Sequence, residues 1–156
     1  MGAGALSEAE DLDTAIVHAS CVAVAGKGLL IVGRSGSGKS SLALQMMALG
    51  AELVADDRVE LSTEGEQVMA RAPKAIAGLI EARGLGLLRA QPAGPVPLAL
   101  VLDLDETETA RLPAPRRKKV LRQSVPLLHA VDTPHFAAAL VQILKMGRVD
   151  PEWPGT

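Results

Sequence analysis

Eight consecutive residues constrain this chain more than any other stretch. Residues 33–40 read Gly-Arg-Ser-Gly-Ser-Gly-Lys-Ser, the G-x-x-x-x-G-K-S pattern of a phosphate-binding loop or Walker A motif. An apolar run at 29–32 precedes the motif, and an Ala/Leu/Met-rich segment typical of a helix follows it. The glycines let backbone N–H groups turn toward phosphate oxygens, and the helix N-terminus adds positive potential. We therefore expect a nucleoside triphosphate to bind at Gly33, Arg34, Ser35, Gly36, Ser37, Gly38, Lys39, Ser40 and Ser41.

Two residues of the motif carry specific chemistry. Lys39 is expected to reach the β- and γ-phosphates, and the Ser40 hydroxyl is expected to bind Mg²⁺. The alternative is a glycine-rich turn that binds nothing, but the Lys-Ser pair and both flanks would then be coincidental.

The amino-acid composition limits the classes of partner that the protein can bind. The chain has 156 residues, a net charge of -2 and a pI near 5.9, which predicts one domain and gives no electrostatic case for nucleic acid. There is one Trp, one Phe and no Tyr, so bases cannot stack on a row of aromatic rings. The single cysteine, Cys21, excludes an intramolecular disulfide and is expected to be a small strand residue. Residues 1–14 do not resemble a signal peptide, and no apolar run is long enough to cross a bilayer. We expect a cytoplasmic protein with no membrane partner.

The patterning predicts an α/β fold with a mixed β-sheet and flanking helices. A strand at 15–24 and a turn at 25–28 form a hairpin with the strand at 29–32, which places an antiparallel element beside the loop. The other expected elements are a helix at 39–49 ended by Gly50, a short strand at 52–57, a hairpin of 58–62 with 67–72, strands at 98–104 and 125–131, and a helix at 135–146 opened by Thr133-Pro134 and ended by Gly147. We expect a P-loop domain at 14–148 between flexible tails at 1–13 and 149–156.

Two stretches are less regular. Residues 74–88 are apolar but contain three glycines, which favours a functional loop over a regular helix. Residues 105–119 are polar and end in Arg116-Arg-Lys-Lys119, which predicts a solvated, mobile surface segment. The alternative for the basic run is a rim that attracts an acidic protein partner.

Paired carboxylates are the main catalytic candidates. Asp56 and Asp57 follow a short strand, and ligands of open α/β sheets gather at such strand ends. One carboxylate could hold Mg²⁺ while its neighbour accepts a proton from an attacking hydroxyl; alternatively, the pair only starts a turn. Glu81 and Arg83 could serve Mg²⁺ and phosphate or form a surface ion pair. On pattern alone, His18 is a structural strand residue and Arg111 carries no signal.

Four stretches in this order resemble a known family: VHAS around His18, GRSGSGKSSLAL across the loop, LVADDRVEL around the aspartates, and IEARGLGLL. They are similar to the C-terminal catalytic domain of HPr kinase/phosphorylase over about residues 18–146. That family phosphorylates a serine of HPr, the phosphocarrier protein of the sugar phosphotransferase system. The resemblance implies a fold like that of phosphoenolpyruvate carboxykinase and an ATP- and Mg²⁺-dependent protein-serine kinase.

Residue roles follow from the same resemblance. His18 matches an active-site histidine, Lys39 the loop lysine, and Ser40 a Mg²⁺ ligand. Asp57 matches the proton acceptor, with Asp56 beside it as a catalytic and metal-binding candidate. Two further matches are Glu81, to a second Mg²⁺ ligand, and Arg111, loosely, to a catalytic arginine.

Departures from the family qualify these expectations. Long members carry an N-terminal domain that this sequence lacks, as in the short forms of alphaproteobacteria. The family's arginine-containing loop near the C-terminus, tied to dephosphorylation by phosphate, corresponds here to residues 125–132, which contain no arginine. An attacking phosphate needs positive charge, so we expect phosphorylase activity to be weak or absent. The family also forms hexamers, which makes a homo-oligomer plausible. Two alternatives stay open: a P-loop kinase of small molecules, and a non-catalytic nucleotide-dependent switch.

Overall fold

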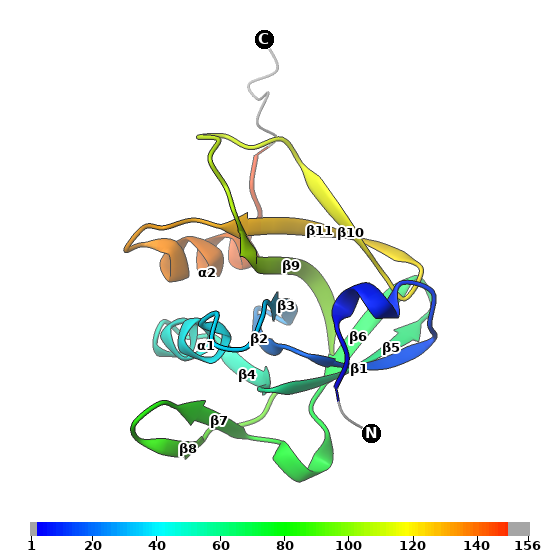
Figure 1. Cartoon of the computed structure of the whole chain (residues 1–156), viewed down its shortest axis with the longest axis vertical. Helices are drawn as coiled ribbons and strands as arrows, with labels where there is room; N and C mark the ends of the chain where they lie inside the picture. The colour runs from blue at the N-terminus through cyan, green and yellow to red at the C-terminus, as the bar shows by residue number, and fades with distance from the viewer. Residues whose placement is uncertain (1–2, 150–156) are drawn as a thin grey trace.

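The structure, a computed structural model, describes residues 3–149 and is built around one strongly curved sheet (Figure 1). Within these residues nine strands form the sheet, in the order β1-β5-β6-β9-β3-β2-β4, with β11 also paired to β9 and β10 to β11. The strands are β1 (Thr14–His18), β2 (Ser20–Val24), β3 (Lys27–Val32), β4 (Glu52–Ala55), β5 (Arg58–Glu64), β6 (Gln67–Arg71), β9 (Val96–Thr107), β10 (Arg116–Val120) and β11 (Gln123–Ala130). Strands β3, β9 and β11 are mutually parallel, whereas β2, β4, β5 and β6 pair antiparallel. The predicted mixed α/β sheet is confirmed.

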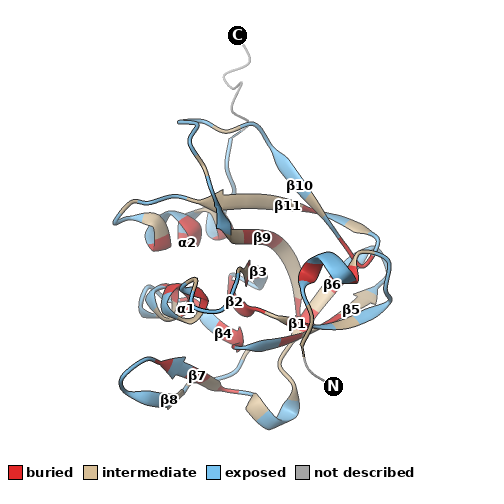
Figure 2. Ribbon diagram, viewed as in Figure 1, coloured by how far each residue is buried: buried red, intermediate tan, exposed pale blue. Residues whose placement is uncertain are grey.

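The sheet separates two apolar cores (Figure 2). On one face lie helices α1 (Lys39–Ala48) and α2 (Phe136–Met146), whose buried side chains, such as Met46 and Leu140, pack on β2, β3 and β9. The other face is enclosed by the curl of the sheet and by a short helix, η1 (Leu6–Ala9). Burying a leucine-sized side chain contributes about 1.5–3 kcal/mol, so both faces stabilise the sheet that carries the loop.

The prediction of one strand over 15–24 is wrong in one respect. Ala19 interrupts this strand and divides it into two, β1 and β2. Strand β1 ends at His18 and pairs with β5, whereas β2 starts at Ser20 and pairs with β3 and β4. Ala19 is fully buried, and its N–H donates to the carbonyl of Asp57 at 3.3 Å. The break therefore places His18 and Ser20 next to the paired aspartates.

The other elements near the loop agree with those predicted from the sequence. The β2–β3 hairpin leads into the loop, α1 leaves it at Lys39, and β5 and β6 form the second hairpin. Cys21 is buried in β2, where burial raises the pKa of its thiol to about 12 and keeps it protonated.

Three other regions differ from expectation. The glycine-rich stretch is a short 3₁₀ turn, η2 (Lys74–Ile76), followed by the hairpin of β7 (Leu79–Ala82) and β8 (Gly86–Arg89). The basic run forms strand β10, paired with β11, whereas residues 108–115 before it have no helix or strand. Helix α2 is capped by His135 rather than opened by Thr133-Pro134, because Thr133 turns back and its carbonyl accepts the N–H of Phe136.

The basic strand anchors the start of the described chain. Lys118, Lys119 and Arg122 form ion pairs with Glu10, Asp11 and Asp13, respectively. Leu6 and Ala9 are buried, so this part of the expected N-terminal tail packs on the domain. The domain limits 14–148 stay a prediction, and residues 1–2 and 150–156 of the expected tails lie outside the described residues. In the described part of the chain, no helix has the length and hydropathy to span a membrane.

Candidate active site

The phosphate-binding loop has the backbone that its glycines predict. Gly36 and Gly38 lie at φ 81° and 99°, and Gly38 caps helix α1. Lys39 bends back over the loop, and its ammonium donates to the carbonyls of Gly33 at 2.8 Å and Arg34 at 3.0 Å. Burial lowers the pKa of Lys39, and the nearby carboxylates of Asp105, Asp56 and Asp57 oppose that shift. The lysine therefore already lies inside the loop where phosphates would sit.

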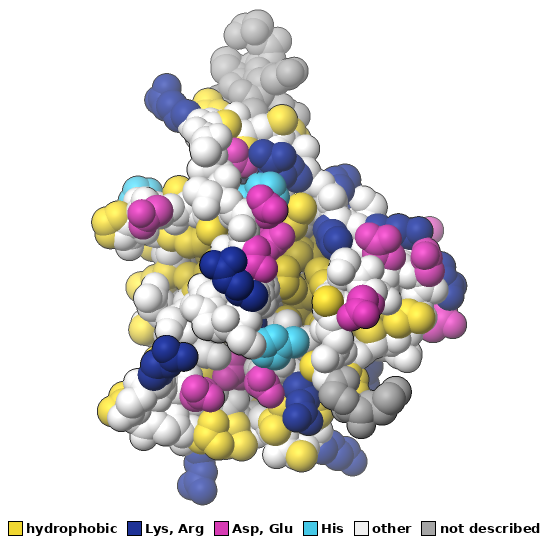
Figure 3. Space-filling model, in the orientation of Figure 1, with side chains coloured by type: hydrophobic (Ala, Val, Ile, Leu, Met, Phe, Trp, Pro, Cys, Tyr) yellow, Lys and Arg dark blue, Asp and Glu magenta, His cyan; other side chains and the backbone are white. Residues whose placement is uncertain are grey.

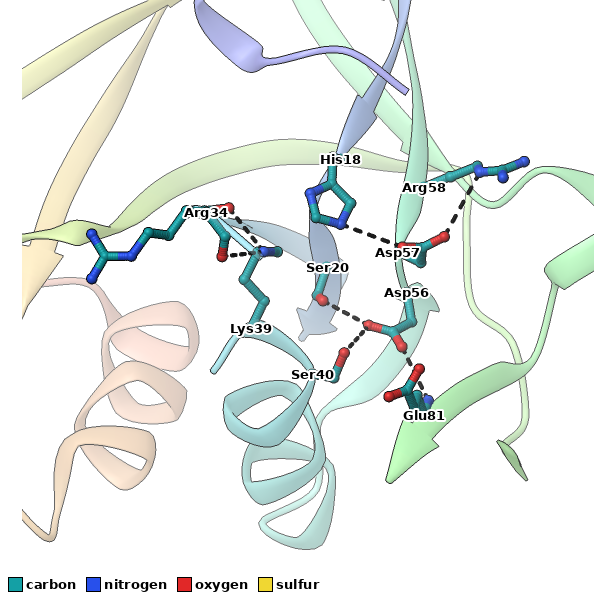
Figure 4. A network of polar contacts seen from close by, with 10 residues as sticks. His18, Ser20, Arg34, Lys39, Ser40, Asp56, Asp57, Arg58 and Glu81 are labelled. Atoms are coloured by element: carbon teal, nitrogen blue, oxygen red, sulfur yellow. Dashed lines mark hydrogen bonds and ion pairs between the residues drawn. The ribbon is translucent and has the colours of Figure 1, made fainter. Parts of the chain in front are cut away.

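Asp56 forms the inner part of the site. The residue is only 4% exposed and directly follows β4. One carboxylate oxygen accepts the hydroxyls of Ser20 and Ser40, both at 2.7 Å, and the other accepts the backbone N–H of Glu81 at 3.1 Å (Figure 4). Hydrogen bonds from three separate elements, β2, α1 and β7, therefore converge on one buried carboxylate.

Asp57 forms the outer part, and its backbone explains why neighbouring side chains diverge. Its φ is 70°, and the N–H of Arg58 donates to the carbonyl of Asp56 at 2.8 Å, closing a tight γ-turn. The Asp57 side chain is 64% exposed, with Oδ1 3.4 Å from Nε2 of His18 and Oδ2 3.7 Å from Nε of Arg58. A non-glycine residue in this conformation is strained by about 1–3 kcal/mol, a cost that is commonly found at functional sites.

These residues border one cavity of about 320 Å³. The loop and the N-terminal end of α1 form one wall; the two aspartates and the β7–β8 hairpin form the opposite wall (Figure 4). Glu81 and Arg83 both border it, so the predicted pair faces the loop. The lining residues are His18, Ser20, Ser35, Gly36, Gly38, Lys39, Ser40, Ser41, Asp56, Asp57, Glu81 and Arg83.

A second hollow adjoins the first through His18 and Ser35, which border both. It encloses about 680 Å³ between residues 3–7, the front of the loop, and the faces of β9 and β11. Its floor includes Val32, Val101 and Leu127. Figure 3 shows a hollow with apolar walls, flanked by charged side chains, on this face of the molecule.

The residues present fit a magnesium ion. Asp56 carries a buried negative charge, and no lysine, arginine or histidine among residues 3–149 forms an ion pair with it. Asp56 and Ser40 offer the hard oxygen atoms that Mg²⁺ prefers, and Mg²⁺ sites often use one or two protein ligands with substrate phosphates. In the described part of the chain, no three acidic, histidine or cysteine side chains cluster to form a full protein cage. The role of Glu81 as a second ligand stays a prediction.

The structure groups most of the predicted site residues and separates one. Arg111 is exposed in the segment between β9 and β10 and does not border either hollow. Pattern reasoning assigned no role to Ser20 or Asp105, although both contact the site. The contact of Asp105 with the loop depends on β9 lying beside β3, and the role of Ser20 depends on the break between β1 and β2 at Ala19, so no local pattern indicates either.

The fold and the loop define a P-loop protein of the α/β class. The chain also matches the family model for the HPr Serine kinase C-terminal domain over residues 11–93. It belongs to this family. The HPr kinase/phosphorylase of Geobacillus kaustophilus (strain HTA426) is 40% identical over 128 residues, covering 74% of this chain and 41% of the relative. That of Geobacillus sp. (strain WCH70) is 44% identical over 100 residues, covering 59% and 32%.

A solved structure supports the fold. The Hpr(Ser) kinase/phosphatase from Coxiella burnetii superposes with a TM-score of 0.72 over 83% of this chain and 88% of that chain, at 22% identity. The chain spans less than half the length of the curated relatives it matches.

Proposed function

We propose that the protein is a Mg²⁺- and ATP-dependent protein-serine kinase that phosphorylates HPr. The observation that carries this proposal is the divergence of Asp56 and Asp57 beside the loop. One carboxylate is buried and surrounded by hydroxyl groups, and the other faces the open cavity next to His18. A protein that only bound a nucleotide would not need the second carboxylate.

The loop and the inner carboxylate would hold the nucleotide. N–H groups of the loop and the Lys39 ammonium would contact the phosphates, so Lys39 would leave the carbonyls of Gly33 and Arg34. Ser40 and Asp56 would hold Mg²⁺, which supplies neutralisation of charge on the transferring phosphoryl group. The hydrogen bonds from Ser20 and Glu81 would keep the Asp56 carboxylate oriented.

The outer carboxylate would act on the acceptor. In the transfer, the serine Oγ forms a bond to the γ-phosphorus while the bond from that phosphorus to the ADP oxygen breaks. The hydroxyl proton passes to the carboxylate of Asp57, which His18 holds from 3.4 Å away. The hollow that meets the cavity at His18 and Ser35 provides a route by which the serine reaches this carboxylate.

The surroundings of the cavity suit a protein acceptor better than a metabolite. Leu85 and Leu87 are 81% and 68% exposed in the β7–β8 hairpin, next to the cavity-lining Arg83. Leucines exposed in a hairpin whose other residues line a cavity offer apolar surface on which a protein can dock. HPr as the acceptor follows from the family. A cytoplasmic location, a homo-oligomer (a hexamer by family resemblance), and weak or absent phosphorylase activity are parts of the same proposal.

The test is to mix the protein with HPr from the same genome and Mg²⁺-ATP, and to detect phosphoserine by mass spectrometry. The controls are HPr with its acceptor serine replaced by alanine and the enzyme variant Asp57→Asn. Phosphoserine with wild type alone supports the proposal. Nucleotide turnover on a metabolite, or tight nucleotide binding without any turnover, would instead support the small-molecule kinase or the switch. Adding inorganic phosphate to phosphorylated HPr then tests the reverse reaction.

A further inference from the structure

Asp105 touches the phosphate-binding loop from outside. It lies in β9, which runs parallel to the loop strand β3, with Asp103 paired to Val32. Both carboxylate oxygens of Asp105 accept the backbone N–H of Arg34, at 3.1 and 3.0 Å. The N–H of Asp105 in turn donates to Oδ1 of Asp103 at 2.9 Å. The end of β9 is therefore hydrogen-bonded to the first turn of the loop.

The same loop residue is tied on its other side to the catalytic lysine. The carbonyl of Arg34 accepts the Lys39 ammonium, so a chain of contacts runs from Asp105 through Arg34 to Lys39. Gly33 is tightly packed, since a Cβ there would lie 3.3 Å from Cβ of Leu104 in β9 and 2.6 Å from Oγ of Ser37 within the loop itself. The start of the loop, at Gly33 and Arg34, is thus packed against β9 and hydrogen-bonded to it.

We propose that Asp105 is a positioning residue for the nucleotide, an anchor that sets the path of residues 33–35 so that the loop N–H groups converge on the phosphates. Lys39 cannot hold this path in the complex, because its ammonium leaves the loop carbonyls for the phosphates. The bond from Asp105 is independent of that movement and maintains the loop's shape. The inference rests on the proposed nucleotide binding, but not on HPr as the acceptor.

The charge of Asp105 argues for this role. A carboxylate near a triphosphate site repels the ligand, so its presence there is unfavourable unless its hydrogen bond is needed. Asparagine keeps an oxygen acceptor and removes the charge. The hydrogen bond and the charge can therefore be separated by comparing Asp105→Ala with Asp105→Asn.

The experiment is calorimetric titration of Mg²⁺-ATP into the whole chain, without an acceptor, for wild type, both Asp105 variants and Glu106→Ala. Glu106 is the matched control, because it is an exposed carboxylate on the same strand that makes no hydrogen bond with the loop. We expect Asp105→Ala to raise the Kd about tenfold, as for the loss of one hydrogen bond. Asp105→Asn and Glu106→Ala should stay within about threefold of wild type, and all four proteins should unfold within about 3 °C of one another.

Each other outcome has a definite meaning. Unchanged affinity for Mg²⁺-ATP in Asp105→Ala would overturn the inference. So would a result in which Asp105→Asn loses as much affinity and as much thermal stability as Asp105→Ala. If wild type binds ATP and Asp105→Ala binds it weakly but HPr is never phosphorylated, the kinase proposal fails and the anchor stands. If wild type does not bind ATP at all, both are overturned.

Discussion

The inner and outer parts of the site contain adjacent aspartates in opposite surroundings. Asp56 is 4% exposed and accepts three hydrogen bonds of 2.7–3.1 Å. The side chain of Asp57 is 64% exposed and has two looser ionic contacts, at 3.4 and 3.7 Å. A buried carboxylate held by several short hydrogen bonds suits a fixed ligand, whereas an exposed one at the open cavity is accessible to the hydroxyl group of an acceptor. Changes in the inner part should therefore alter binding and stability, and changes in the outer part should alter rate.

The largest expected effect is on rate, from Asp57→Asn. Asparagine also tolerates the left-handed backbone, so the fold should not change. Without a proton acceptor, kcat for HPr phosphorylation should fall about 10²–10⁴-fold, while the Kd for Mg²⁺-ATP stays within about threefold. Steady-state kinetics together with calorimetry measure both values. Near-normal kcat would remove the distinction between the two aspartates.

Next is the effect of Asp56→Asn on binding. The variant loses the charge that would hold Mg²⁺, although the serine hydroxyls can still bond to the amide. Wild type should gain about 2.7 kcal/mol of stability at an ATP concentration 100 times its Kd, and most of that gain should vanish in the variant. Thermal unfolding with ATP, with and without Mg²⁺, provides the measurement. Equal stabilisation of both proteins by Mg²⁺-ATP would contradict the assignment of Asp56.

A smaller change, Ser20→Ala, tests the inner part without touching a proposed ligand. It removes one of the hydrogen bonds to a buried carboxylate, so the free energy of unfolding should fall by about 1–3 kcal/mol. Urea denaturation of the protein without ligands measures this loss. Ser41→Ala is the control, because Ser41 is exposed at the same cavity and makes no hydrogen bond to Asp56. If the two variants are equally stable, the inner part is not held by this bond.

The smallest rate effects should come from the two contacts of Asp57. His18→Gln should lower kcat about tenfold, because Asp57 loses an orienting partner. Arg58→Ala should change it less than about twofold, since the pair is exposed and 3.7 Å apart. The test is the ratio of the two kcat values under identical conditions. A larger effect from Arg58 would reverse the proposed roles.

Local chemistry made the core of the site predictable. The loop, the start of α1 at Lys39 and the β2–β3 hairpin depend on short-range rules for glycine, lysine and β-branched residues. The pairing of Asp56 with Ser40 also follows, because both lie at the ends of elements that meet at one edge of the sheet.

Long-range contacts explain most of the errors. The break at Ala19 depends on a bond to Asp57, 38 residues later, which no local pattern encodes. The basic run is a strand because its backbone pairs with β11, and Lys119 forms an ion pair with Asp11. These tertiary contacts override its polar composition. Asp105 contacts Arg34 only once the strands lie side by side.

The γ-turn at Asp57 has a consequence for anyone who tries to make this protein more heat-resistant. Glycine adopts a positive φ without steric strain, so Asp57→Gly is an attractive substitution by structural criteria alone. It would raise the free energy of unfolding by removing that strain. The variant would also have lost the proposed proton acceptor. A search guided only by melting temperature would therefore select, at this position, against the chemistry that the turn supports.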